Sequence, residues 1–174
     1  MYDFDTVVDR RNTGSLKWDV AENELPMWVA DMDFKTAPQI IEAISARVSH
    51  GVFGYSIIPD EWNDAYISWW DRRHGLKIER DSLIFCTGVV PAISSTVRKL
   101  TTPGENVLIM TPVYNIFFNS IFNNGVNVQE SPLGYENGRY FVDYDRLEHD
   151  LSNPQTSLMI FCNPHNPRYH LDKG

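Results

Sequence analysis

The chain has 174 residues, 43% of them apolar, which is enough to build a buried core. Its formal net charge of -8 and its lack of any Lys/Arg-rich run argue against a nucleic-acid partner. The amino terminus "MYDFDTVVDRR" is acidic and has no apolar signal segment, and no apolar run is long enough to cross a bilayer. We therefore expect a cytoplasmic protein without a membrane partner.

Neither the cysteines nor the histidines indicate a metal site. Cys86 and Cys162 each close an apolar run, so we expect them to be reduced, small buried side chains. No second Cys or His stands at ligand spacing from either one. The five histidines are scattered along the chain: His50, His74, His149, His165 and His170.

The first 35 residues show no sustained periodicity, and "ELPMWVADMDF" (24–34) is too rich in Pro and Asp to predict a strand. This segment is interpreted as an extended arm. A helix is predicted next, over residues 36–51, because Thr36 and Gln39 stand at capping-box spacing and Pro38 suits a first turn. Its apolar residues repeat on one face up to Gly51.

A second helix is predicted from Asp60 to His74, with its Trp and Tyr side chains on one face. After it, short apolar runs alternate with amphipathic segments. Strands are predicted at 82–86 ("SLIFC"), 106–110 ("NVLIM"), 126–131 ("VNVQES") and 157–162 ("SLMIFC"), and helices at 89–100, 116–125 and 147–151. The pair Asn137-Gly138 predicts a tight hairpin turn.

This alternation predicts an α/β fold with a mostly parallel sheet and helices on both faces. Ligands of such sheets bind beyond the carboxyl ends of the strands. The candidate sites are therefore the loops that follow Cys86, Met110 and Cys162.

The first of these loops, "CTGVVPA", places Gly88 directly before a helix. The backbone amides of Val89 and Val90 can then face an anion such as a phosphate, and the helix dipole adds to the attraction. The alternative is that the glycine serves only the backbone geometry of the turn.

The other two loops offer an aromatic ring and polar side chains. Tyr114 either stacks on a flat ligand or seals the edge of the core. Asn163, His165 and Asn166 in "CNPHNP" either bind a ligand or cap the turn.

Two carboxylates lie close together in the arm. Asp31 and Asp33 resemble an acid-base pair, yet alternate positions of an extended segment point in opposite directions. We therefore expect solvated or backbone-bonded aspartates.

Six motifs together resemble a known family. In chain order they are "FDTVVDRRNTGSLKWD", "MWVADMDFKTAP", "HGVFGYS", "TGVVPAI", "TPVYNIF" and "CNPHNP". They resemble the pyridoxal-phosphate enzymes of the aspartate-aminotransferase fold (fold type I). Within the class I/II aminotransferases they are most similar to the cystathionine β-lyase-like, carbon-sulfur lyase subgroup.

The resemblance implies a role for particular residues in binding pyridoxal 5'-phosphate. The backbone of Gly88, Val89 and Val90 corresponds to the phosphate cradle. Tyr114 corresponds to the aromatic residue that stacks on the pyridine ring. Asn166 corresponds to the side chain that hydrogen-bonds the ring hydroxyl.

Two further segments receive roles from the resemblance. Tyr55 corresponds to a tyrosine that reaches the phosphate of the neighbouring subunit, which implies a homodimer. Val29, Ala30 and Asp31 correspond to the segment that closes over the amino-acid end of the substrate. The implied reaction is β-elimination of cystathionine or a cysteine-like thioether, giving pyruvate, ammonia and a thiol.

The resemblance assigns the Schiff-base lysine to a segment well beyond "NPHNP", so no catalytic residue is identified within this chain. Lys173 lies seven residues after Asn166 and is not expected to replace it. Residues 168–170, Arg-Tyr-His, also depart from the family pattern.

We expect residues 1–50 to form the arm and first helix. Residues 51–174 would form the front of the large cofactor domain, truncated after this loop.

Three alternatives stay open. The motifs are shared with transaminases, so an aminotransferase is the second enzyme hypothesis. The chain alone is also interpreted as an inert remnant that binds phosphate or a partner subunit without turnover. A small phosphate-binding module outside this family is the third.

Overall fold

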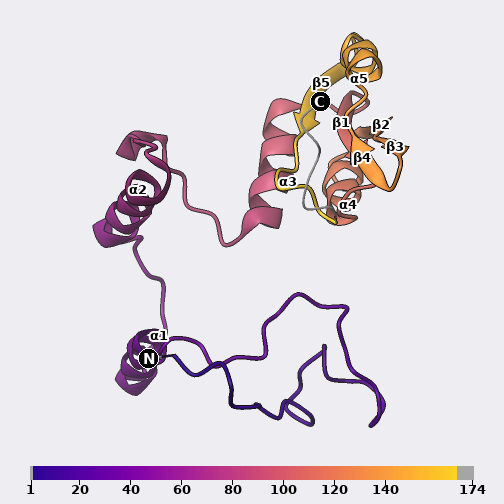
Figure 1. Ribbon diagram of the computed structural model, residues 1–174. Coiled ribbons are helices and arrows are strands. Elements are labelled where there is room, and N and C mark those ends of the chain that lie inside the picture. Colours follow the sequence, from indigo (N-terminus) through magenta and orange to yellow (C-terminus); the bar gives the residue numbers. More distant parts are fainter. Residues whose placement is uncertain (1, 168–174) are drawn as a thin grey trace. The chain divides into compact units, whose positions relative to one another are not determined.

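The computed structural model describes residues 2–167, so Lys173 and residues 168–170 lie outside the described part. The chain divides into two compact units, one ending at Ile57 and the other beginning at Ile58. Each is described by itself (Figure 1). The assignment of residues 1–50 and 51–174 to two domains stays a prediction.

The first unit consists of the arm and helix α1 (Pro38–His50). Residues 2–37 contain turns and bends but no helix or strand, so the absence of a strand at 24–34 is confirmed whereas the arm is not extended throughout. The capping box was wrong: Ala37 occupies the N-cap position and no side chain caps the helix. Gly51 ends the helix in the left-handed conformation, with φ 74°, as a C-terminal glycine commonly does.

The second unit opens with helix α2 (Asp60–His74), whose bounds match the sequence prediction. The rings of Trp62 and Tyr66 stack with centroids 5.7 Å apart. Trp62 also meets the edge of Phe85 at 5.4 Å. Arg80, in the short 3-10 helix η1 (Arg80–Ser82), pairs with Asp60 and Asp64.

The strand predicted at 82–86 is wrong. Residues 83–86 have no strand partner within the described chain, and Ile84 is 86% exposed. Cys86 is also exposed, which contradicts its expected burial, whereas Cys162 is half-buried; both cysteines are free. The apolar pattern alone does not form a strand, because a strand needs a neighbour to pair its backbone groups.

The other predicted strands form a three-stranded parallel sheet in the order β2-β1-β5. The strands are β1 (Asn106–Thr111), β2 (Asn127–Pro132) and β5 (Thr156–Ile160). The central strand β1 pairs with both others, and its inner residues 107–110 are buried. Because both faces of β1 are covered, its sequence is continuously apolar.

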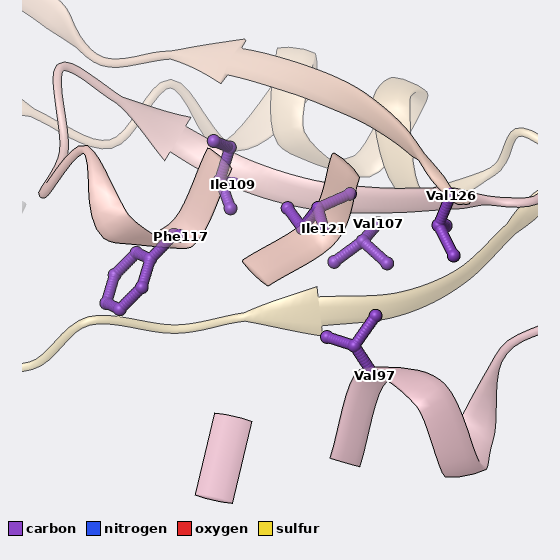
Figure 2. Packing of buried hydrophobic residues seen from close by; sticks show 6 residues of the cluster. All are labelled: Val97, Val107, Ile109, Phe117, Ile121 and Val126. Carbon is purple, nitrogen blue, oxygen red and sulfur yellow. The ribbon is translucent and has the colours of Figure 1, made fainter. Parts of the chain in front are cut away.

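One face of the sheet carries helices α3 (Val89–Leu100) and α4 (Ile116–Phe122). Figure 2 shows the apolar side chains gathered between these helices and the strands. The buried cluster consists of Val97, Val107, Ile109, Phe117, Ile121 and Val126. This core holds the carboxyl ends of β1 and β5 in fixed positions, because both strands contribute to it or pack against it.

Helix α5 (Tyr144–Leu151) packs against β2. The parallel sheet with its helices confirms the expected α/β fold. Gln129 of β2 lies beside Leu108 on the face away from Val107. Its side-chain amide donates to the carbonyl oxygen of Asp150 at 2.7 Å. Asp143 caps α5 by accepting a hydrogen bond from the Arg146 amide.

The predicted hairpin is also confirmed. Strands β3 (Gly134–Glu136) and β4 (Arg139–Phe141) pair antiparallel around Asn137 and Gly138. These two residues have φ values of 49° and 81°, as a type I' turn requires.

Candidate functional site

The loops that follow β1 and β5 are joined by one hydrogen bond. His165 Nε2 lies 2.8 Å from the carbonyl oxygen of Pro112. His165 is only 3% exposed, although its loop neighbours Asn163 and Asn166 are exposed. The structure therefore brings together two of the three loops singled out in the sequence, as expected for the carboxyl edge of a parallel sheet.

Tyr114 lies two residues after Pro112 and is 42% exposed. Its ring meets the edge of Phe117, with centroids 5.9 Å apart, and Phe117 belongs to the buried core. Both interpretations of Tyr114, sealing the core edge and stacking on a flat ligand, therefore stay open. A ring supported on one side and open to solvent can accept a flat partner.

The third loop leads into α3. No side chain caps this helix, so its first amides, including those of Val89 and Val90, have no side-chain acceptor at the N-cap. Gly88 precedes them with φ 166°, an extended conformation that any residue adopts. A Cβ added at Gly88 would meet only Pro91 Cδ, at 3.6 Å. Backbone geometry therefore does not explain the glycine.

The first turns of α3 lie beside the end of β5. Ala92 and Ile93 line a hollow of about 240 Å³ together with Leu158 and Ile160. This hollow shows that α3 packs along β5. The position of Gly88 beside the other two loops stays a prediction.

In the arm, Asp31 and Asp33 converge instead of pointing apart. Arg10 Nη1 lies 2.6 Å from Asp31 Oδ2 and 2.6 Å from Asp33 Oδ1. The chain bends at Asp33, so the alternation of an extended strand does not apply. The expectation of solvated or backbone-bonded aspartates was wrong, because both carboxylates are ion-paired.

Asp33 accepts two further hydrogen bonds. Lys17 Nζ lies 2.8 Å from Oδ2, and Trp18 Nε1 lies 2.8 Å from Oδ1. Lys17, Trp18 and Arg10, in that order, hold the pKa of the Asp33 carboxyl well below its usual range. Asp33 therefore remains a charged acceptor and is unsuited to proton transfer near neutral pH.

Lys17 also donates to the carbonyl oxygen of Asp31 at 2.8 Å, which fixes the backbone beside Ala30 and Val29. Val29 is half-buried and Ala30 exposed. Tyr55 belongs to the same unit and is fully exposed. The assigned roles of Val29, Ala30, Asp31 and Tyr55 stay predictions.

Sequence reasoning missed the cations that organise the arm. The available signal was the charge of Arg10 and Lys17, two of the three basic residues that precede the acidic "ADMDF". It also missed the Pro112 carbonyl, for which no side-chain signal exists.

Within residues 2–167, no three His, Cys, Asp or Glu side chains gather as metal ligands would. None of the helices described there has the length and apolarity that a membrane crossing requires.

The sequence profile of the family "Aminotransferase class I and II" matches residues 22–168. The cystathionine beta-lyase PatB of Bacillus subtilis is 41% identical over 170 residues, which are 94% of this chain and 44% of PatB. The chain thus spans less than half the length of this curated relative.

Two solved structures are similar over 99% of the chain. Cystalysin from Treponema denticola, whose structure contains a pyridoxal 5'-phosphate cofactor, gives a TM-score of 0.90 at 36% identity. The chain covers 46% of cystalysin. A PLP-bound putative aminotransferase from Clostridium difficile gives a TM-score of 0.89 at 39% identity, again with 46% of that chain covered.

Proposed function

Because the chain belongs to the class I and II aminotransferase family, we propose that it forms the amino-terminal part of a pyridoxal-phosphate-dependent carbon-sulfur β-lyase. The substrate class is cystathionine or a cysteine-like thioether, as in the relative named cystathionine beta-lyase. The observation that carries the proposal is the hydrogen bond between His165 and Pro112, which joins the loops of Tyr114 and Asn166.

The described residues fit pyridoxal phosphate. The uncapped amides after Gly88 suit a phosphate, and a Cβ at position 88 would make only an ordinary contact with Pro91 Cδ at 3.6 Å. Tyr114 offers an exposed ring for stacking, and the exposed amide of Asn166 suits a ring hydroxyl. When bound, the cofactor supplies an electron sink that stabilises a carbanion at the α-carbon of an amino acid.

The residues of this chain would bind and orient rather than transfer protons. Val89 and Val90 would hold the phosphate through their amides, while Tyr114 and Asn166 would fix the plane of the ring. The arm around Val29 and Ala30 would cover the amino-acid end of the substrate and exclude water. The resemblance assigns the proton-transferring lysine to a segment beyond the NPHNP loop, so none of the residues named here is proposed to transfer a proton.

The assembly we propose is a cytoplasmic homodimer. Tyr55 is fully exposed in its own unit, which leaves its phenol available to the phosphate of a second subunit. A dimer that loses phosphate affinity when Tyr55 is changed to Phe would support this arrangement. A monomer, or an unchanged affinity, would contradict it.

Binding by the 174-residue chain is tested with pyridoxamine 5'-phosphate, which needs no lysine. Isothermal titration should give a dissociation constant that Asn166→Ala and Tyr114→Leu raise about tenfold each, or about 1.4 kcal/mol. The matched controls are Asn163→Ala in the same loop and Tyr135→Leu in β3, which is 61% exposed. Equal affinities in all four variants would contradict the proposal.

Transamination is the second candidate, favoured by the 39% identity to the putative aminotransferase. Product analysis of the whole protein separates the two reactions. The lyase releases pyruvate, ammonia and a thiol from cystathionine. An aminotransferase instead leaves the carbon-sulfur bond intact and passes the amino group to a 2-oxo acid.

A further inference from the structure

The two side chains assigned to the cofactor ring come from loops far apart in the sequence. Tyr114 follows β1, and Asn166 lies beyond β5. A flat ring can bind both side chains only if they stand at the right distance from each other, because the stacking contact and the hydrogen bond in the ring plane must form at the same time. Neither loop contains regular structure that would fix its end.

The bond between His165 and Pro112 meets this need. His165 immediately precedes Asn166, and Pro112 lies two residues before Tyr114, so the 2.8 Å contact ties the backbones next to both side chains. A carbonyl oxygen only accepts, so Nε2 carries the hydrogen and donates it. His165 itself is buried and does not need to touch a ligand to act.

The second ring nitrogen of His165 supports a specific role for this residue. Nδ1 is buried and has no hydrogen-bond partner among the described residues. A buried polar atom without a partner costs free energy, and an apolar side chain of similar size would avoid that cost. Compared with such an apolar side chain, a histidine at this position adds the hydrogen-bond donor Nε2.

We propose that His165 is a positioning residue that sets the separation of Tyr114 and Asn166 for the cofactor ring. This inference rests on the proposed function. It predicts selectivity: loss of the Nε2 donor weakens recognition of the ring and leaves the phosphate cradle at Gly88 intact, because that cradle is built from another loop.

The test uses the 174-residue chain with two probes, pyridoxamine 5'-phosphate and inorganic phosphate. His165→Leu removes the donor and keeps apolar volume, whereas His165→Gln keeps an N–H. His165→Leu should raise the dissociation constant for pyridoxamine 5'-phosphate about tenfold, and His165→Gln should restore most of the affinity. Affinity for inorganic phosphate should not change. His149→Leu, at an exposed histidine of α5, is the control.

Each result has a distinct meaning. Unchanged pyridoxamine 5'-phosphate affinity in His165→Leu overturns the inference, and so does an equal loss for inorganic phosphate, which would indicate general unfolding. If the unaltered chain binds inorganic phosphate but no pyridoxamine 5'-phosphate, the proposed function itself fails. Nitrogen NMR of His165 gives a readout without ligand: a hydrogen on Nε2 is expected, and an Nε2 without a hydrogen overturns the inference.

Discussion

Lys17 and Asp33 form an ion pair at 2.8 Å within an arm that has no regular secondary structure. Lys17 is only 8% exposed, which is unusual for a lysine. The large apolar side chains of this segment are mostly exposed, among them Met27 at 84% and Trp28 at 63%. The arm therefore depends on polar contacts, with Asp33 as the shared acceptor.

We expect Asp33→Asn to loosen the arm. The amide keeps the shape of the carboxylate but loses its charge, so Lys17 and Arg10 are left without their shared anion. Amide hydrogen exchange should become several-fold faster around residues 10–33. Asp19→Asn, at an exposed aspartate of the same arm, serves as the control and should leave exchange unchanged. Equal exchange in both variants would mean that the ion pairs do not order the arm.

The same carboxylate predicts a pH dependence. The pKa of Asp33 in the folded arm is held well below its ordinary value of 3.8, mainly by Lys17. The ion pair therefore contributes its full stabilisation above that ordinary value, and the contribution is lost progressively as the pH falls below it. The Trp18 Nε1–H resonance, from a donor to Asp33, should shift in this acid range. An identical shift in Asp33→Asn would assign the titration to another group.

The sequence predicted the sheet and its helices because these depend on local periodicity. The bounds of α2, the run in β1 and the turn at Asn137-Gly138 follow from patterns a few residues long. The segment 82–86 has the same apolar pattern but no strand neighbour in the described chain. An apolar run of this kind therefore becomes a strand only where a neighbouring strand can pair with its backbone.

The parts of the candidate site that consist of particular side chains could be predicted from the sequence. The parts that depend on backbone groups could not. Gly88 was identified by its place before a helix, and Tyr114 and Asn166 by their places after strands. The link between their loops depends on the Pro112 carbonyl, which every residue type possesses. In the arm, Asp31 and Asp33 were judged from a strand geometry that the bend at Asp33 does not follow.

The core should respond to substitution according to burial. Ile121 is fully buried between α4 and the sheet, so Ile121→Ala should lower the free energy of unfolding by about 2–5 kcal/mol. Ile84→Ala, at a residue that is 86% exposed, should change it by less than about 0.5 kcal/mol. Urea unfolding followed by circular dichroism measures both. Similar losses in the two variants would contradict the observed packing.

A substitution at Gly88 should lower the affinity for phosphate without lowering the stability of the fold. The glycine's φ of 166° suits any residue and a Cβ would meet only Pro91, so Gly88→Ala should leave the urea midpoint unchanged. The added methyl group would stand next to the first amides of α3, where we place the phosphate. Affinity for pyridoxamine 5'-phosphate and for inorganic phosphate should then fall about tenfold. Ser95→Ala, at an exposed position in the middle of α3, should alter neither affinity. Full phosphate affinity in Gly88→Ala would mean that the anion does not bind at this end of the helix. A lowered urea midpoint would mean that the glycine is needed for the turn itself.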